Sequence, residues 1–462
     1  MDCVSVWGFE ICRAAVRSNL LKFTYMNLLR NEGPIPPDDV ALNFARRQGD
    51  RISAQGIGLA GLVGFAIAWL LAYQFSIMES SLLLVLFLVG TALPMAVLSF
   101  AVNGVWRRGT SGLCSTPQPV NWTRGIIKFT GLAGTLLALV LCYWLFPEYA
   151  KVYYRPVWNT VQWMLFPTIL LAIPYIILVD CRMIDPEDGY WHAGLVFLGR
   201  WREVNLAQLK AHAMGWMVKG FFLPFMLAGA IAHLDFLTKE GVNFSSFGYL
   251  YNTTINLILI IDVTFGSIGY LLTLRILDSH ITSTEPTWLG WLSAVICYRP
   301  FSGFFWTTFL SYEGKTNWMY WLQPYPIFFI TWGFAIIILH VIYVWATCSF
   351  GCRFSNLTNR GIIVDGPYRY LKHPGYVSKN LAWWLMAVPF VAHASWPEAL
   401  RACICLLLTN VIYFGRAWTE ERHLNRDPAY KKYSQWIEQN GLFAGLRQTI
   451  HKVLQRRYEL FA

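Results

Sequence analysis

A chain of 462 residues in which 56% are hydrophobic and only 14% are charged lies outside the range of soluble domains, where about 25% of residues carry charge. This composition excludes a soluble enzyme and predicts an all-α, polytopic integral membrane protein. The formal net charge of +11 is compatible with nucleic-acid binding. Because the basic residues gather in short segments between apolar runs, they indicate membrane topology instead, and no nucleic-acid partner is expected.

Apolar runs of about 18 residues or more predict about ten transmembrane helices. The seventh is the weakest, because Arg299-Pro300 could equally mark a broken or re-entrant helix. A crossing is nevertheless expected there, since losing it alone would move the C-terminal motifs to the other side of the membrane. The ten predicted ranges are 53–75, 80–103, 125–146, 160–179, 216–234, 249–274, 288–311, 319–347, 377–396 and 399–418.

The lysines and arginines between these runs predict the orientation. Most of them fall on the side that holds both termini, whereas the opposite side keeps chiefly Lys151, Arg155, Lys239 and Lys315. Both termini and the C-terminal motifs are therefore expected to be cytoplasmic. We divide the chain into a cytoplasmic N-terminal arm (1–52), a multi-span N-terminal region (53–318) and a C-terminal module (319–462).

Two polar features lie outside the C-terminal module. Asp185, Asp188 and His192 fall between the fourth and fifth spans and could bind a metal ion or a headgroup, although a cytoplasmic loop is the simpler interpretation. Asp262 lies inside the sixth span, where a carboxylate is either functional or paired with another buried polar group. Since no ligand spacing is diagnostic, no metal site is predicted.

The first motif of the C-terminal module runs from Gly366 to Tyr376, with the sequence GPYRYLKHPGY. Gly366-Pro367 predicts a turn that presents Tyr368 at the membrane interface. His373-Pro374 predicts a helix start, whose free N–H groups are suited to an anionic group. Gly375 would let a ligand approach the backbone, and His373 and Tyr376 would supply hydrogen-bond donors and an aromatic face.

The second motif follows one short apolar hairpin and contains Arg416, Glu420 and Glu421. Arg416 and Glu420 share a helix face, so a simple ion pair would explain their spacing. The hairpin, however, returns both carboxylates to the His373-Pro374 turn. This favours a site that grips a charged, water-soluble cofactor against the bilayer.

At these two motifs the chain resembles the isoprenylcysteine carboxyl methyltransferase family and its relatives among membrane phospholipid and thiol methyltransferases. The likeness covers roughly the last 100 to 140 residues, including a tyrosine-bearing helix with Tyr430 and Tyr433. It implies a cytosolic S-adenosylmethionine site beneath a lipid-facing tunnel. Two departures bear on the substrate: Ser378-Lys379-Asn380 replaces a glycine-containing segment, and Ser434-Gln435-Trp436-Ile437 follows the tyrosines. The implied residues are Arg416 and His373 for catalysis, and Tyr368, His373, Gly375, Tyr376, Glu420 and Glu421 for the cofactor.

The predicted function is S-adenosylmethionine-dependent methyl transfer, at the cytoplasmic membrane face, to a hydrophobic or lipid-like small molecule. Carboxyl O-methylation is slightly favoured, because Arg416 can orient an acidic acceptor. An amine or thiol acceptor would instead need a general base, with His373 and Glu420 as candidates. Two alternatives remain: an NADPH-dependent membrane reductase of the sterol-reductase type, and a non-enzymatic transporter or scaffold. Membrane lipids are the other expected partners.

Overall fold

The computed structural model describes residues 52–314, 316–391 and 395–445, which are mostly helical. The predicted N-terminal arm lies outside these residues except for Ile52. Eight of the described helices are long and apolar enough to cross a membrane, and they confirm a polytopic, all-α membrane protein. They are Ala54–Gln74 (α3), Ser80–Val97 (α4, extended by the π-helical turn η1 at Leu98–Val102), Trp122–Leu145 (α5), Arg155–Asp180 (α6), Leu206–Glu240 (α8), Phe247–Leu271 (α9), Pro326–Cys348 (α13) and Trp396–Leu424 (α15).

Shorter elements connect these helices. The remaining α-helices are Gly189–Phe197 (α7), Trp288–Val295 (α10), Phe301–Thr308 (α11), Trp318–Leu322 (α12), Pro374–Ala387 (α14) and Pro428–Asn440 (α16). Single 3₁₀ turns occur at Val105–Arg107 (η2), Gly109–Ser111 (η3), Pro147–Ala150 (η4), Trp201–Glu203 (η5), Arg275–Leu277 (η6), Gly351–Arg353 (η7) and Gly366–Arg369 (η8). Two short strands, Ser283–Thr284 (β1) and Thr358–Asn359 (β2), pair antiparallel, with Ser283 opposite Asn359.

Two of the ten predicted spans take a different form. The range 288–311 is not one helix but α10 and α11, separated at Arg299-Pro300, because proline lacks the N–H that a continuous helix needs. The range 377–396 is not one long helix: it holds most of the 14-residue α14, which stops where Val388 adopts a left-handed conformation. The predicted hairpin nevertheless forms: Trp384 of α14 donates to Asn410 of α15 (2.7 Å), and Asn410 donates to Asn380 (2.7 Å).

The α10–α11 pair still carries the chain along the length of a span. Ser293 lies 3.3 Å from Thr419 near one end of α15, and Arg401 lies 3.5 Å from the Ser311 carbonyl near the other. These contacts cover 18 residues of α15, or about 27 Å of helix, close to the ~30 Å thickness of a bilayer core. The two short helices together therefore run about the length of a span, antiparallel to α15.

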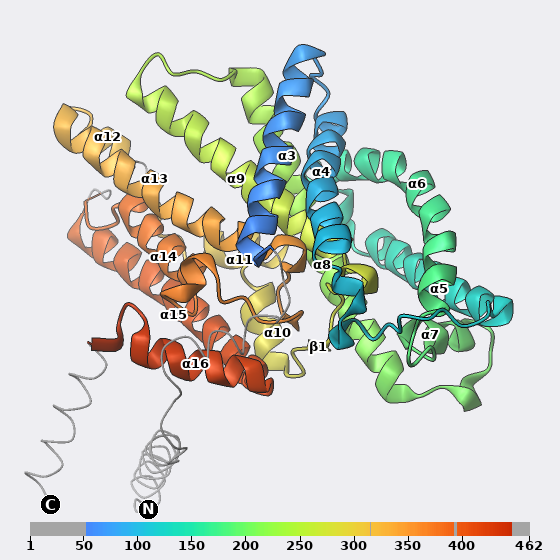
Figure 1. Cartoon of the computed structure of the whole chain (residues 1–462). Helices are drawn as coiled ribbons and strands as arrows, with labels where there is room; N and C mark the ends of the chain where they lie inside the picture. The colour runs from blue at the N-terminus through green and yellow to red at the C-terminus, as the bar shows by residue number, and fades with distance from the viewer. Residues whose placement is uncertain (1–51, 315, 392–394, 446–462) are drawn as a thin grey trace, which may run out of the picture.

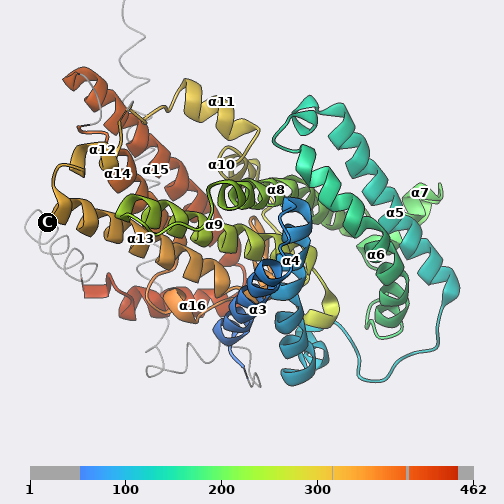
Figure 2. The same ribbon diagram turned by 90° about the horizontal axis from the view of Figure 1, so that it is seen from above.

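The long helices form two groups on either side of a central pair. In Figure 2, α5, α6 and α7 lie on one side, α12 to α16 lie on the other, and α8 and α9 run between them. On α9, the buried Asp262 accepts hydrogen bonds from Tyr343 (2.7 Å) and Thr347 (2.5 Å) of α13. Asp262 is thus paired with buried polar groups, and it ties the central helix to the C-terminal helices.

Small residues let helices approach closely, as in other membrane proteins. A Cβ atom added to Gly64 of α3 would lie only 2.1 Å from the Gly90 carbonyl oxygen of α4. The core that these helices build includes Phe65, Phe87 and Phe222, whereas many leucines and tryptophans on the outer faces stay exposed, as expected of surfaces in contact with lipid.

One buried arginine holds the loop that precedes the first motif. Arg360 follows β2 and is 3% exposed. Its guanidinium donates five hydrogen bonds to backbone carbonyls, which matches the number of its N–H groups. The accepting carbonyls belong to Ser279 (2.6 Å), Gly269 (2.6 Å), Phe354 (2.8 Å), Leu272 (3.3 Å) and Cys352 (2.9 Å). Arg360 therefore joins the end of α9, the segment before β1 and the loop after α13.

Candidate active site

The first motif folds as a turn followed by a helix start. Gly366 has φ +63°, and a Cβ atom there would lie 2.5 Å from the Ser349 hydroxyl oxygen, so the position requires glycine. η8 then leads to His373, the N-cap residue of α14, with Pro374 in the first helical turn. His373 and Tyr376 lie on neighbouring turns with their rings stacked at a centroid distance of 5.4 Å. The local prediction is confirmed in form: a turn, then a helix that begins at the His-Pro pair.

The hairpin brings Glu421 to His373. The Glu421 carboxylate contacts His373 Nε2 (3.0 Å) through one oxygen and Lys372 Nζ (3.1 Å) through the other. Lys372 also contacts Glu438 of α16 at 2.7 Å. Glu421 thus orients His373, and Lys372 joins α16 to the first motif.

Glu420, the neighbouring carboxylate, makes a separate contact. It accepts a hydrogen bond from the Tyr376 hydroxyl at 2.8 Å. Within the described part of the chain Glu420 makes no ion pair with Arg416, so the two do not form the simple i,i+4 pair that their spacing allows. The two adjacent carboxylates therefore hold the two aromatic residues of the first motif separately.

Arg416 is buried in an aromatic box. Its guanidinium lies 5.2 Å from the ring centroids of Tyr298 and Tyr376 and 5.9 Å from that of Tyr413. Its Nη2 donates to the Tyr298 hydroxyl (3.2 Å) and to the Asn356 side chain. A planar cation stacked on rings is held more rigidly than a lysine would be. Two of its partners, Tyr298 and Asn356, lie outside both motifs.

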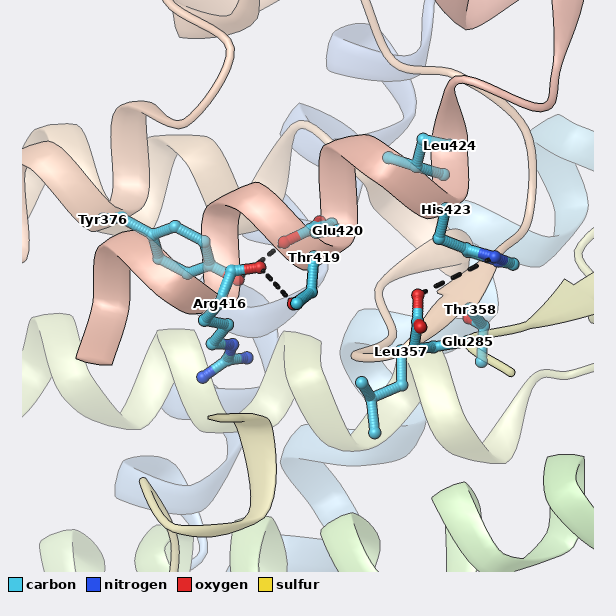
Figure 3. Close-up of a pocket in the computed structure, with 9 residues that line it drawn as sticks. All are labelled: Glu285, Leu357, Thr358, Tyr376, Arg416, Thr419, Glu420, His423 and Leu424. Carbon is cyan, nitrogen blue, oxygen red and sulfur yellow. Dashed lines mark hydrogen bonds and ion pairs between the residues drawn. The ribbon is translucent and has the colours of Figure 1, made fainter. Parts of the chain in front are cut away.

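One face of α15 lines a first cavity of about 330 Å³. Arg416, Thr419, Glu420 and His423 follow the i, i+3, i+4, i+7 spacing of a helix face. Figure 3 shows these side chains together with Glu285, whose carboxylate points toward His423. The other lining residues are Leu357, Thr358, Tyr376 and Leu424.

A second cavity of about 540 Å³ shares Thr358, Glu420 and Leu424 with the first. It is lined by Tyr368, Lys372 and His373 of the first motif and by Tyr430 and Tyr433 of α16. Figure 1 shows α16 lying across the lower end of the helix bundle. α16 therefore covers this cavity.

Two tyrosines of α16 line the second cavity, and they differ in their hydrogen bonds. The Tyr433 hydroxyl donates to the Tyr368 carbonyl at 2.7 Å, whereas the buried Tyr430 hydroxyl has no partner within the described residues. Burial, and then the negative charge of Glu421, raise the pKa of both phenols far above the usual value, so both stay protonated. The Tyr430 hydroxyl is thus a donor available to a ligand.

The structure brings five of the predicted site residues to the cavity walls, namely Tyr368, His373, Tyr376, Arg416 and Glu420. Glu421 supports His373 instead, and Gly375 lines neither cavity. At Gly375 a Cβ atom would only reach ordinary contact with Tyr343 at 3.6 Å. The sequence interpretation missed Tyr298, Asn356 and Thr358, which come from unmarked segments, and also His423, although its helical spacing from Arg416 was visible. The segment that holds Glu285 was interpreted as a helix cap rather than as part of a substrate entrance.

A bundle of helices long enough to span a membrane, with two polar cavities that share a wall, defines an integral membrane protein with a candidate binding site. Residues 328–426 match the model of the Isoprenylcysteine carboxyl methyltransferase (ICMT) family, which places this module where the sequence resemblance predicted it. Neither the curated proteins nor the solved structures contain a match to the chain. The match covers both motifs and the hairpin but not α16 or the N-terminal region.

Proposed function

We propose that the protein is an S-adenosylmethionine-dependent methyltransferase that acts at a membrane surface on a hydrophobic or lipid-like small molecule. The observation that carries this proposal is the position of Glu420 and Thr358 in the walls of both cavities. A cofactor in the second cavity and an acceptor in the first would meet at this shared wall. The family match at residues 328–426 supports the reaction type.

The second cavity suits the proposed cofactor. Its volume, counted with the open space at its mouth, is about 540 Å³, against about 330 Å³ for the first cavity. The aromatic side chains of Phe350, Tyr368 and Tyr430 offer surfaces for an adenine ring, and Glu420 offers a carboxylate for an ammonium group. The unpartnered hydroxyl groups of Tyr430 and Thr358 add polar contacts that the protein itself does not use.

The chain's residues position the reactants rather than react themselves. When bound, S-adenosylmethionine supplies an electrophilic methyl group on a positively charged sulfur. Tyr376 holds Glu420, Glu421 holds His373, and the aromatic box holds Arg416, so these three polar side chains have fixed orientations. Fixed alignment in a site shielded from water lowers the barrier to displacement reactions in which charge is quenched.

The acceptor and the membrane side belong to the same proposal. Arg416 lines the first cavity, and a carboxylate acceptor stays a prediction that rests on this residue. Because Nη2 of Arg416 is already bonded to Asn356 and Tyr298, the structure adds no new support for it. Arg353, Arg360 and Lys372 line the second cavity beside α16, and such basic residues favour the cytoplasmic side of a membrane.

An NADPH-dependent reductase is the second candidate, because Arg353, Arg360 and Lys372 line the second cavity. Basic residues are what a 2′-phosphate requires. Two of these cations are engaged, however: Arg360 by five carbonyl groups and Lys372 by two carboxylates. The arrangement thus favours the methyltransferase.

The test uses the full chain in lipid nanodiscs. S-Adenosylmethionine, S-adenosylhomocysteine and NADPH are titrated by calorimetry against the native protein, Glu420→Gln and the control Glu398→Gln, which changes an exposed carboxylate at the other end of α15. We expect both S-adenosyl compounds to bind, with at least ~10-fold weaker binding to Glu420→Gln alone. Binding of NADPH alone would establish the reductase, and no binding would leave the transporter or scaffold.

A further inference from the structure

A buried acid and a histidine face each other in the first cavity without a direct hydrogen bond. Glu285 is 2% exposed and His423 is 6% exposed. Glu285 Oε2 and His423 Nδ1 lie 4.0 Å apart, and neither atom has a hydrogen-bond partner within the described residues. Unpartnered buried polar atoms are costly, so two that face one cavity indicate a missing ligand.

The surrounding contacts fix the acid in place. Glu285 Oε1 accepts from Arg422 Nη2 at 3.1 Å and from the backbone N–H of Thr287 at 3.1 Å, while the Glu285 N–H donates to the Leu357 carbonyl. Gly290 makes room for it, because a Cβ atom there would lie 2.3 Å from Glu285 Cγ. The chain thus builds a cradle for this carboxylate and leaves one oxygen unused.

The separation of the two unused atoms suits a bridging ligand atom. A distance of 4.0 Å is too long for a hydrogen bond, yet one heteroatom can sit about 2.8 Å from both. An amine nitrogen can donate a proton to each of these acceptors, whereas a hydroxyl or thiol donates its single proton to one of them. On the other side of the imidazole, Nε2 lies 3.2 Å from the Ser283 hydroxyl. If the imidazole proton is on Nε2, that N–H donates a hydrogen bond to the Ser283 hydroxyl. Nδ1 is then unprotonated and can accept a proton from a ligand in the cavity.

The other candidate bases are already engaged. His373 Nε2 contacts Glu421 and the Glu420 carboxylate accepts from Tyr376, so neither matches the unused Glu285–His423 pair. The pair lines the cavity that also holds Arg416, beside Thr358 and Leu424 of the wall shared with the second cavity (Figure 3). Glu285 comes from outside the family match, which covers only residues 328–426.

We propose that Glu285 and His423 bind the protic group of the methyl acceptor, a hydroxyl, thiol or neutral amine, and remove its proton during methyl transfer. This inference rests on the proposed methyltransferase function. The acceptor heteroatom forms a bond to the methyl carbon, and the carbon–sulfur bond of S-adenosylmethionine breaks with its electron pair remaining on sulfur. The acceptor proton passes to His423 Nδ1, and Glu285 Oε2 stabilises the resulting imidazolium by its charge.

The experiment measures transfer of tritiated methyl groups from S-adenosylmethionine to dodecanol, dodecanethiol, dodecylamine and dodecanoate in nanodiscs. Full-length native protein is compared with Glu285→Gln, His423→Ala and the control Ser293→Ala, which removes a hydroxyl of α10 outside both cavities. We expect transfer to at least one of the three protic amphiphiles, and little to dodecanoate. Glu285→Gln and His423→Ala should each lower this transfer by at least ~100-fold, and Ser293→Ala should not.

S-Adenosylhomocysteine affinity, measured on the same samples, separates this proposal from folding and from the function on which it rests. It should stay within about twofold of native in both site variants. Loss of this affinity in both would assign the pair a purely structural role and overturn the proposal. So would transfer to dodecanoate alone, or cofactor binding without transfer to any protic amphiphile. Failure of native protein to bind either S-adenosyl compound would instead refute the proposed function.

Discussion

Buried charges serve different purposes in the N-terminal region and in the C-terminal module. In the N-terminal region Asp180 is bound by Arg124 (2.8 Å) and Lys128 (2.9 Å), so its charge is neutralised within a helix contact. Beside the C-terminal module, Glu285 and His423 each leave a buried polar atom facing a cavity. The ion pairs of Asp180 join α5 to α6, whereas the Glu285–His423 pair leaves two polar atoms to the cavity.

The residues of the site also come from both sides of the boundary predicted at residue 318. Glu285 and Tyr298 precede that boundary, yet they contact His423 and Arg416 of the C-terminal module. The N-terminal region thus contributes walls to the cavity as well as membrane spans. Variants that separate supporting residues from ligand-binding residues would sharpen this comparison.

The largest effect is expected for Arg360→Met. Within the described residues this change leaves the carbonyl groups of Ser279, Phe354 and Cys352 without a donor, whereas those of Gly269 and Leu272 keep other donors. At about 1–3 kcal/mol for each unsatisfied group, the loss approaches the ~5–15 kcal/mol that stabilises a whole domain. We expect no monodisperse protein by size-exclusion chromatography in detergent. Arg369→Met, an exposed change in the same loop, is the control. A native elution profile for Arg360→Met would contradict the role of this clamp.

The next effect is expected for Arg416→Lys. A lysine cannot reproduce both the stacking in the aromatic box and the bonds of Nη2 to Tyr298 and Asn356. Because small misplacements at a reacting centre cost about 100-fold, we expect methyl transfer to fall by that factor while S-adenosylhomocysteine still binds. Radiometric assay and calorimetry measure the two quantities. Arg401→Lys, at the start of the same helix, should behave as native, and equal losses in both variants would argue against a local role for Arg416.

A smaller effect is expected for Gly366→Ala compared with Gly375→Ala. Alanine at the left-handed Gly366 costs about 1–2 kcal/mol, and its Cβ would lie 2.5 Å from Ser349 Oγ. At Gly375 the nearest contact is 3.6 Å, so alanine should fit there without loss of stability. Thermal unfolding followed by intrinsic fluorescence measures both. If Gly375→Ala alone weakens cofactor binding, the predicted backbone contact at this glycine gains support.

The smallest effects concern the two tyrosines of α16. Tyr433→Phe removes the hydrogen bond to the Tyr368 carbonyl and should lower stability by about 1 kcal/mol. Tyr430→Phe removes a hydroxyl that has no partner within the described residues, so stability should not fall, but S-adenosylmethionine affinity should drop about 3- to 10-fold. Thermal unfolding and calorimetry distinguish the two variants. The reverse pattern would mean that Tyr430, not Tyr433, anchors α16.

The parts of the fold and site that follow local rules could be predicted from the sequence. Long apolar runs gave eight of the ten predicted spans, and Gly366-Pro367 and His373-Pro374 gave the turn and helix start. The short hairpin correctly predicted that the carboxylates return to the His-Pro turn. The turn and the helix start are marked by adjacent residues, and the spans and the hairpin follow from the lengths of single apolar segments.

The rest depends on contacts between segments far apart in the chain. Glu285 reaches His423 across 138 positions and looks in the sequence like part of a helix cap. Tyr298 and Asn356 belong to no periodic pattern, so nothing local marked them as partners of Arg416. The break at Arg299-Pro300 was recognised, but only the contacts along α15 show that two short helices together carry the chain the length of one span.

The wall that separates the two cavities has a consequence for the order of events during turnover. Since Glu420 borders both cavities, cofactor and acceptor would occupy different chambers and need not pass through one another's position. We therefore expect the cofactor and the acceptor to be bound to the protein at the same time, in a ternary complex. The methyl group would pass directly between them, with no covalent methyl-enzyme intermediate. S-Adenosylhomocysteine should then compete with S-adenosylmethionine but not with the acceptor, and a methylated product could return to the lipid while the spent cofactor is still bound.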